Sequence, residues 1–428
     1  MNAQHPGILL LAGCALFTAA NTQALDFGAT VHYTSEYTTN TLRTESDEID
    51  EWIQEPGVDL TAAHDTASLE LDGAYGYSRR FYDKDYWSDY NSTTGSGNAV
   101  WHALPERLDF HLRNSRTEST QQALDTPLPD NRQVVSTTEA GSTLMLQPRQ
   151  GDDLQFEYQY VDISPSSTST GSTRNNGTGR YILGLSPNRF LQLETTYSDI
   201  KYDGVAFTNA EYWLATLGYR QTGNQLDVDV NYGHNWYKRS GQADTDDPSY
   251  DLALTWRASA NSTFTLDGSH RITDQSSSLT DDAGSTGAVS ENTATNAAFK
   301  ESSADMGLTQ IFGRTTLTLG GFWRKEQYAE GVQLSNETTG GRIGLSRDLT
   351  RNTVLNLNGE YANRKFSDQG DNQDETRLSV NLLHELGRAL DLSWGVRYED
   401  RQADISTSYD EWIGYVTISY QVLGAGNR

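Results

Sequence analysis

The chain has 428 residues, a formal net charge of −26 and a mean hydropathy of −0.65. Beyond the N-terminus, no stretch approaches the roughly 20 apolar residues of a membrane-spanning helix, which excludes a helical membrane protein. The acidic balance excludes nucleic acid and acidic lipid headgroups as direct ligands. A β-barrel remains open, because strands that alternate lipid-facing and lumen-facing residues are hydrophilic on average. The 23 Tyr, 9 Trp and 12 Phe suit the aromatic girdles of such a barrel.

The N-terminus has the pattern of a secretion signal. Residues 8–20 are apolar, and Thr22-Gln23-Ala24 then offers a small-residue cleavage site. We therefore predict a signal peptide over residues 1–24 and one barrel domain over residues 25–428. An alternative is a lipobox at Leu11-Ala12-Gly13-Cys14, which would make Cys14 a lipidated first residue. Ordinary cleavage leaves no cysteine, as suits an oxidising compartment, and we expect no N-terminal plug or passenger domain.

From Leu25 onward the repeating signal is period-2 alternation in segments of about ten residues. Such a period places each apolar set on one face of a strand, with Asp, Glu, Arg, Gln and Asn on the other. The apolar rows tend to end in Tyr or Trp, which suits a bilayer interface. A soluble β-sandwich or β-solenoid is the alternative, weakened by the persistence of the pattern without a second domain. Clear examples are Leu154–Tyr160, Leu226–Tyr232, Tyr250–Trp256 and Leu390–Tyr398.

Connections alternate in length, as in outer-membrane barrels with short periplasmic turns and longer outer loops. With an opening strand at residues 25–37 and a closing strand at 409–422, the turns predict an all-β, transmembrane, antiparallel up-and-down barrel of about twenty strands. Eighteen strands result if a weak pair such as Trp213–Tyr219 is misread. An even count puts both termini in the periplasm. The predicted short turns are Ala62–His64, Pro105-Glu106, Pro148–Gly151, Ser186–Asn188, Thr222–Asn224, Ser259–Asn261, Gly313, Thr350–Asn352 and Gly387-Arg388; the longer loops include Asp83–Gly97, Ser164–Asn176, Ser240–Pro248, Ser276–Asn292 and Ser367–Asp371.

The closing strand resembles the aromatic-rich final strand that the barrel-assembly machinery reads. Its departure is that residues 424–428 follow the last apolar position, whereas such strands usually end on an aromatic residue. We expect that machinery and outer-membrane lipid as partners. One face of the strand carries Trp412, Val416, Ile418, Tyr420 and Val422.

The opposite positions of the alternation predict a lumen of mixed charge. One interpretation is that these groups simply satisfy one another around water; the other is a polar conduit with a transverse field. The cations are all arginine, which can bridge carboxylates bidentately. The candidate lumen-lining residues are Glu70, Asp72, Asp109, Arg113, Glu157, Glu194, Asp227, Asp229, Asp251, Arg257, Asp267, Arg271, Arg324, Glu360, Arg364, Asp391, Arg397 and Glu399.

Motifs for catalysis, cofactors and metals are missing from the sequence. There is no GxSxG elbow, phosphate-cradling glycine loop or HExxH, and the histidines are scattered singly. Acidic groups at Asp244-Asp246-Asp247 and Asp368-Asp371-Asp374 lack the spacing of a calcium loop, so we interpret them as solvated outer loops. We predict no catalytic, cofactor-binding or metal-binding residues and no enzymatic activity, although an active site assembled across strands is the remaining alternative.

The opening of the mature chain carries a family resemblance. Ser35-Glu36-Tyr37 and Asn40 precede an acidic run from Glu45 to Glu51, then Pro56-Gly57-Val58, the alternating segment Leu69–Tyr77 and Phe81-Tyr82. This resembles the putative beta-barrel porin 2 family and the outer-membrane barrels of exopolysaccharide and PEP-CTERM loci. The resemblance implies a barrel in or near a polysaccharide secretion apparatus, with polysaccharide and export-apparatus proteins as partners.

Three functions follow as hypotheses for a protein of the Gram-negative outer membrane. The first is a channel for polar polymer or solute, associated with exopolysaccharide export. The second is a general diffusion porin that mildly favours cations, because acids exceed bases. The third is a structural or adhesive barrel whose acidic surface loops bind neighbours through divalent ions.

Overall fold

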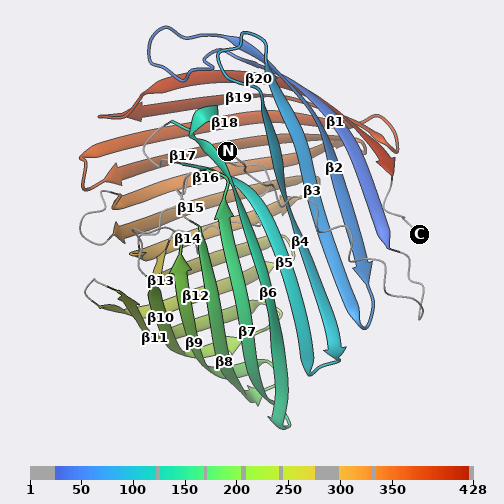
Figure 1. The fold of residues 1–428 in the computed structure, drawn as a ribbon. Coiled ribbons are helices and arrows are strands. Elements are labelled where there is room, and N and C mark those ends of the chain that lie inside the picture. Colours follow the sequence, from blue (N-terminus) through green and yellow to red (C-terminus); the bar gives the residue numbers. More distant parts are fainter. Residues whose placement is uncertain are drawn as a thin grey trace, which may run out of the picture.

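The chain forms one closed antiparallel sheet of twenty strands (Figure 1). The computed structural model describes residues 25–121, 126–167, 171–203, 209–240, 244–274, 298–328 and 334–423. Each strand pairs with its sequence neighbours, and β1 pairs with both β2 and β20, which closes the barrel. Closure leaves no edge strand, as a sheet surrounded by lipid requires. The predicted barrel and its count of twenty are confirmed, and Trp213–Tyr219 lies within one of the strands.

The strands run from 12 to 18 residues, longer than the roughly 9–11 residues that cross a bilayer. The first ten are β1 Asp26–Thr38, β2 Glu51–Asp65, β3 Leu69–Tyr82, β4 Tyr90–Leu104, β5 Leu108–Thr120, β6 Arg132–Arg149, β7 Asp152–Pro165, β8 Ser172–Ser186, β9 Arg189–Tyr202 and β10 Ala210–Gln221. The second ten are β11 Leu226–Arg239, β12 Thr245–Ser259, β13 Ser262–Asp274, β14 Ala298–Phe312, β15 Thr315–Tyr328, β16 Asn336–Thr350, β17 Thr353–Phe366, β18 Asp371–Glu385, β19 Leu390–Ala403 and β20 Tyr409–Leu423.

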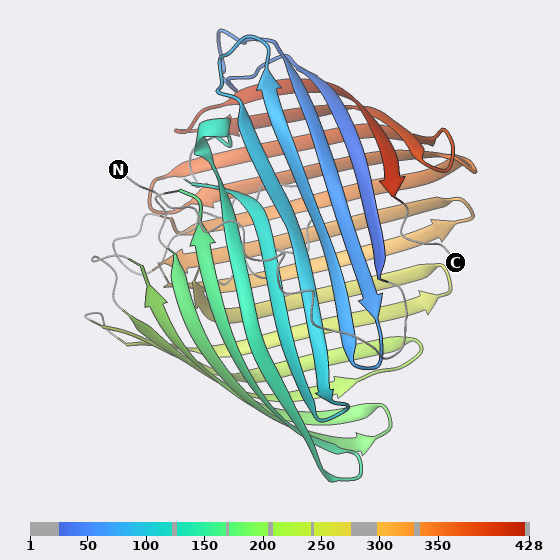
Figure 2. The same ribbon diagram turned by 45° about the vertical axis from the view of Figure 1, so that its right-hand side comes forward.

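Short turns and longer connections gather at opposite ends of the barrel (Figure 2). A 3-10 turn, η1, covers Pro129–Asn131 in the connection between β5 and β6. No helix within the described ranges is long and apolar enough to cross a bilayer. We call the end with the longer connections the loop end.

The apolar rows face outward, away from the enclosed lumen. At the seam of the closed sheet, Tyr33 of β1 lies between Pro56 of β2 and Ile418 of β20. Tyr33 and Ile418 are 47% and 48% exposed, although both are large and apolar. A soluble protein rarely exposes such side chains in contiguous patches, whereas a lipid-facing band consists of them. The closing-strand residues Trp412, Val416, Ile418, Tyr420 and Val422 share this exposed face.

Eight of the nine predicted short turns fall at strand ends, and the first was placed too early. Ala62–His64 lies inside β2, where Ala62 pairs with Phe27 of β1. The turn instead begins at Thr66, whose hydroxyl accepts the Leu69 amide at 3.0 Å and whose amide donates to the Leu69 carbonyl. A Thr hydroxyl makes such local bonds readily, so the polar Thr66 marks the turn better than the alanines before it.

Three of the predicted long loops are shorter than expected. Residues 90–97 belong to β4, residues 172–176 to β8, and residues 245–248 to β12. The first two stretches are rich in Ser, Thr, Gly and Asn, the third is Thr-Asp-Asp-Pro, and none of them shows apolar alternation. That composition follows from a sheet that continues beyond the bilayer, where both faces meet water. The predicted loop Ser276–Asn292, the signal peptide and Cys14 lie outside the described residues.

Buried apolar side chains are few and gather near the loop end. One cluster contains Val135, Val161 and Ile163 on β6 and β7. A second cluster, which we call the corner cluster, joins β9, β10, β11 and β13 across the lumen side of the sheet. The corner cluster consists of Ile200, Tyr202, Ala210, Tyr237 and Ile272.

Candidate functional site

The candidate site is the inner wall of the barrel. Side chains alternate across a strand, so the residues between exposed apolar positions face the lumen. Glu157, for example, lies between Phe156 and Tyr158, which are 48% and 52% exposed. All of the predicted lumen-lining residues occupy such positions opposite the apolar rows. Their role in lining a channel stays a prediction.

Two ion pairs join predicted lumen residues to one another. Arg257 of β12 lies 2.6 Å from Asp227 of β11, and Arg397 of β19 lies 2.7 Å from Glu399 on the same strand. Both pairs are partly exposed, so each contributes little free energy of unfolding. Their main effect is to hold charge in fixed positions on the wall.

Seven of the other fourteen predicted charges are paired with residues that the sequence analysis did not single out. These partners also lie at the alternating positions that face the lumen. Listing every charged residue at those positions in each strand would have found them. The contacts are Glu194–Arg180 at 2.6 Å, Asp229–Arg220 at 2.7 Å, Asp109–His102 at 2.8 Å, Glu70–His102 at 3.1 Å, Glu301–Arg271 at 3.5 Å, Glu301–Arg324 at 3.6 Å and Glu360–Arg377 at 3.9 Å.

The remaining predicted residues divide into two kinds. Arg113 donates to Asn98 at 3.0 Å, and Arg364 donates to the Thr338 hydroxyl at 3.4 Å. Asp72, Glu157, Asp251, Asp267 and Asp391 have no hydrogen bond or ion pair to another side chain in the part of the chain that the structure describes. Asp267 lies directly opposite Asp305 in the β13–β14 register, and like charges in that position repel.

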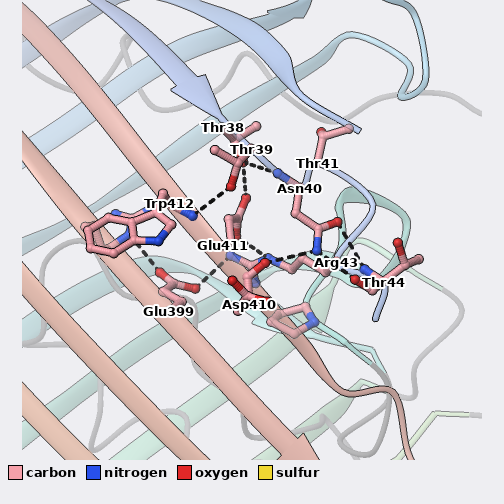
Figure 3. Close-up of polar contacts among 12 residues, drawn as sticks. Thr38, Thr39, Asn40, Thr41, Arg43, Thr44, Glu399, Asp410, Glu411 and Trp412 are labelled. Carbon is pink, nitrogen blue, oxygen red and sulfur yellow. Dashed lines mark hydrogen bonds and ion pairs between the residues drawn. The ribbon is translucent and has the colours of Figure 1, made fainter. Parts of the chain in front are cut away.

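At the loop end, the β1–β2 connection is fastened to β19 and β20 by a cluster that we call the rim latch (Figure 3). It consists of Thr38, Asn40, Arg43, Glu399 and Glu411. Arg43 donates from Nε to Glu411 at 2.9 Å and from Nη2 to Glu399 at 2.8 Å, and the Thr38 hydroxyl donates to Glu411. The Asn40 side-chain amide, Nδ2, donates to the Asp410 backbone carbonyl at 3.0 Å, across the seam.

Arg43 is the charged centre of the rim latch. Its guanidinium carbon lies 5.2 Å from the centroid of the Tyr409 ring. Burial disfavours the charged guanidinium, but Tyr409, Glu411 and Glu399 outweigh burial and raise the pKa of Arg43. The group therefore stays cationic, and each carboxylate keeps a fixed counter-charge. The sequence reading missed Arg43 and Glu411, because Arg43 lies in a connection without periodicity.

The β1–β2 connection is also hydrogen-bonded to the β3–β4 connection, which is the next one around the rim. Glu51 is fully buried and accepts from the Thr41 hydroxyl at 2.8 Å and from the Lys84 amide at 3.0 Å. The Trp87 indole donates to the Thr41 carbonyl at 3.0 Å, and Lys84 Nζ donates to Asp50 at 2.7 Å. The rim near the seam is therefore ordered by side-chain bonds between two neighbouring connections.

On the other side of the loop end, the wall folds onto itself. Arg174 of β8 contacts Asp274 of β13 at 2.6 Å, and the Tyr202 hydroxyl donates to the same carboxylate at 3.2 Å. Asp274 and Arg174 are both buried. Together with the corner cluster, this pair packs the end of β13 against β8 and β9.

The acidic groups expected in solvated outer loops lie partly in strands. Asp246 and Asp247 belong to β12 and pair with His234 at 3.0 Å and Lys300 at 2.6 Å. Asp371 begins β18 and accepts from the Ile405 amide at 2.8 Å. Within the described ranges, no group of three or more His, Cys, Asp or Glu side chains is arranged to hold a metal ion.

A closed sheet with an apolar outer face and a charged inner wall defines an outer-membrane β-barrel with a porin-like fold. The family model described as Putative beta-barrel porin 2 matches residues 339–422, which confirms the family resemblance. The match covers strands β16–β20, at the opposite end of the chain from the residues that suggested it. No curated protein sequence matches the chain.

Solved structures with a similar fold include a siderophore receptor and an iron transporter. The siderophore receptor PirA from Acinetobacter baumannii aligns with a TM-score of 0.54 and 8% identity, over 92% of this chain and 80% of that one. The FrpB iron transporter from Neisseria meningitidis (F3-3 variant) aligns with a TM-score of 0.54 and 8% identity, over 92% of this chain and 81% of that one. At such low identity, the likeness establishes the fold alone.

Proposed function

We propose that the protein is a non-enzymatic channel of the outer membrane, with both termini in the periplasm, that passes polar polymer or solute in association with exopolysaccharide export. The observation that carries the proposal is the inner wall, on which charges of both signs are fixed in pairs across neighbouring strands. Barrels of 16–18 strands already leave an aqueous channel, and this sheet has twenty strands.

Exopolysaccharide suits this wall because hydroxyl groups both donate and accept hydrogen bonds. Arginines and carboxylates that already neutralise one another offer donors and acceptors without a strong net field. The resemblance to barrels of exopolysaccharide loci supports the same substrate class. The partners in this proposal are outer-membrane lipid, the barrel-assembly machinery, polysaccharide and the proteins of an export apparatus.

A general diffusion porin that favours cations is the second candidate. Asp267 favours it, because its side chain is exposed to the lumen and has no cationic partner in the described part of the chain. A passive porin of this kind would conduct small cations without any dependence on polymer.

The deciding experiment combines a deletion strain with planar bilayers. The proposal expects channels from the purified protein and, on deletion, loss of surface polysaccharide that complementation restores. If the purified protein conducts, and the deletion strain has normal surface polysaccharide but impaired uptake of small solutes, the protein is the diffusion porin. A well-folded barrel without conductance would overturn both channel functions and favour a structural or adhesive barrel.

A further inference from the structure

The inner wall contains a recess of about 350 Å³ along β14–β17. That volume falls within the roughly 300–1,000 Å³ of pockets that hold small molecules. The recess opens to the lumen and combines aromatic rings, among them the half-buried Phe322, with polar and charged groups. Its lining includes Phe322, Arg324, Asn336, Thr338, Arg342 and Glu360.

Two glycines create the floor of this recess. In the β15–β16 register, Phe322 lies directly opposite Gly340, and Arg342 lies directly opposite Gly320. A Cβ atom on Gly340 would be 2.3 Å from Phe322 Cζ, and a Cβ atom on Gly320 would be 2.7 Å from Arg342 Nε. Each long side chain therefore lies flat over the glycine of the neighbouring strand instead of projecting into the lumen.

The flattened arginine is held in place at its far end. Arg342 crosses β15 and donates to Asp305 on β14, and its guanidinium carbon lies 5.9 Å from the Phe322 ring centroid. The floor is therefore a ring beside a fixed guanidinium plane. The glycines explain why this part of the wall is hollow.

The groups around the floor carry no net charge. Arg324, Arg342 and Arg364 face Asp305, Glu326 and Glu360, three cations against three anions. Several are already bonded within the recess: Asn336 and Tyr328 donate to Glu326 at 3.0 and 3.2 Å, and Arg364 donates to Thr338 at 3.4 Å. The recess thus offers many donors and acceptors around an apolar face.

We propose that this recess is a binding subsite for a neutral saccharide ring, which stacks on Phe322 and hydrogen-bonds to the charged rim. A sugar ring has an apolar C–H face and a hydroxyl edge, and each hydroxyl donates and accepts. Charged partners make the stronger hydrogen bonds. An aromatic anion would fit the floor, but the three arginines that would attract it already face three carboxylates, so the balanced charge favours the neutral ligand. The inference rests on the proposed channel function and names its substrate site.

The test uses the full-length purified barrel in planar bilayers, with maltohexaose and cellohexaose as neutral probes and benzoate as the aromatic anion. Phe322→Ala removes the ring from the floor. Tyr415→Ala is the matched control, because Tyr415 of β20 lies opposite Gly395 of β19 in the same way but outside the recess. Heat-modifiable mobility on gels verifies that both variants are folded. Isothermal titration calorimetry measures binding of the same probes in detergent.

We expect a hexaose to block the open-channel current, and Phe322→Ala to raise the half-blocking concentration at least about tenfold. Tyr415→Ala should change that concentration less than about twofold. The inference would be overturned if neither hexaose blocks or binds the open channel. It would also be overturned if the half-blocking concentration is the same for Phe322→Ala and the parent. Tighter, Phe322-dependent block by benzoate would also overturn it. A barrel without conductance that still binds a hexaose through Phe322 would support the binding subsite and contradict the channel function.

Discussion

Arg43 and Glu411 meet across the seam at which the last strand closes on the first, with Arg43 Nε 2.9 Å from Glu411 Oε2. Backbone pairing of β1 with β20 closes the sheet along its length, and this ion pair fastens its loop end. Their side chains are 12% and 5% exposed, so water screens the contact little.

The first prediction concerns that contact. Arg43→Met leaves Glu399 and Glu411 without their shared cation, and removing one partner of a buried pair costs about 3–5 kcal/mol of unfolding free energy. Thermal unfolding followed by circular dichroism should report a clear loss. Arg79→Met is the control, because Arg79 and Asp89 form an exposed pair, 3.4 Å apart, worth at most about 1 kcal/mol. Equal effects of both variants would contradict a buried latch.

The second prediction concerns pH at the rim. The hydrogen bond from Lys84, with a second from Tyr37, lowers the pKa of Asp50 below its ordinary value of 3.8. A lowered pKa in the folded state contributes stability above the ordinary value, and that stability is lost as pH falls through the folded pKa. Melting temperatures of the parent and Asp50→Asn should therefore differ at neutral pH and converge in acid below 3.8. If the difference in melting temperature between the parent and Asp50→Asn stays constant in acid, ionisation of Asp50 is not the cause of that difference.

The third prediction separates the two faces of one strand. Leu217 is 61% exposed on the outer face of β10, and Thr216 points inward. Leu217→Arg places a charge in lipid and should cost about 2–4 kcal/mol near the bilayer midplane. Thr216→Arg should cost under about 1 kcal/mol, because the lumen is hydrated. Urea unfolding in lipid vesicles measures both. The reverse order of the two costs would refute the assignment of faces.

The fourth prediction concerns a close backbone approach. A Cβ atom on Gly233 of β11 would lie 1.9 Å from the Ala215 carbonyl oxygen of β10. Gly233→Ala should therefore force these strands apart and cost about 1–3 kcal/mol or more. Gly414→Ala is the control, because a Cβ atom there has no neighbour within 4 Å. Assembly yield in vesicles should fall for Gly233→Ala alone; an unchanged yield would mean that the strands shift at little cost.

The barrel could be predicted because alternation is a local property of each strand. The row Leu154–Tyr160 specifies one strand and its outward face without any knowledge of its partners. The same parity placed Asp227 and Arg257 on the inner face, where they form an ion pair. The predicted set left out Arg180 and Arg220, which have the same parity, and parity alone does not say which carboxylate each of them contacts.

The rim latch and the flat pair of Phe322 and Arg342 could not be predicted from the sequence, because each depends on more than one segment of the chain. Arg43 lies in an irregular connection, and its partners come 356 and 368 residues later. The Phe322–Gly340 contact depends on register between two strands, which a single sequence does not specify. In both cases the contact depends on which segments the closed sheet brings together, and not on any one segment alone.

The position of Arg43 in the chain has a consequence for the order of assembly. Arg43 is made 356 residues before Glu399 and 368 residues before Glu411. Contacts that close such long loops form late, because their entropy cost must be met first. Until β19 and β20 are in place, Arg43 is a cation without its counter-charges. The rim latch therefore forms only in the completely assembled barrel. A truncated or stalled chain would lack these contacts, and its loop end near the seam would stay disordered.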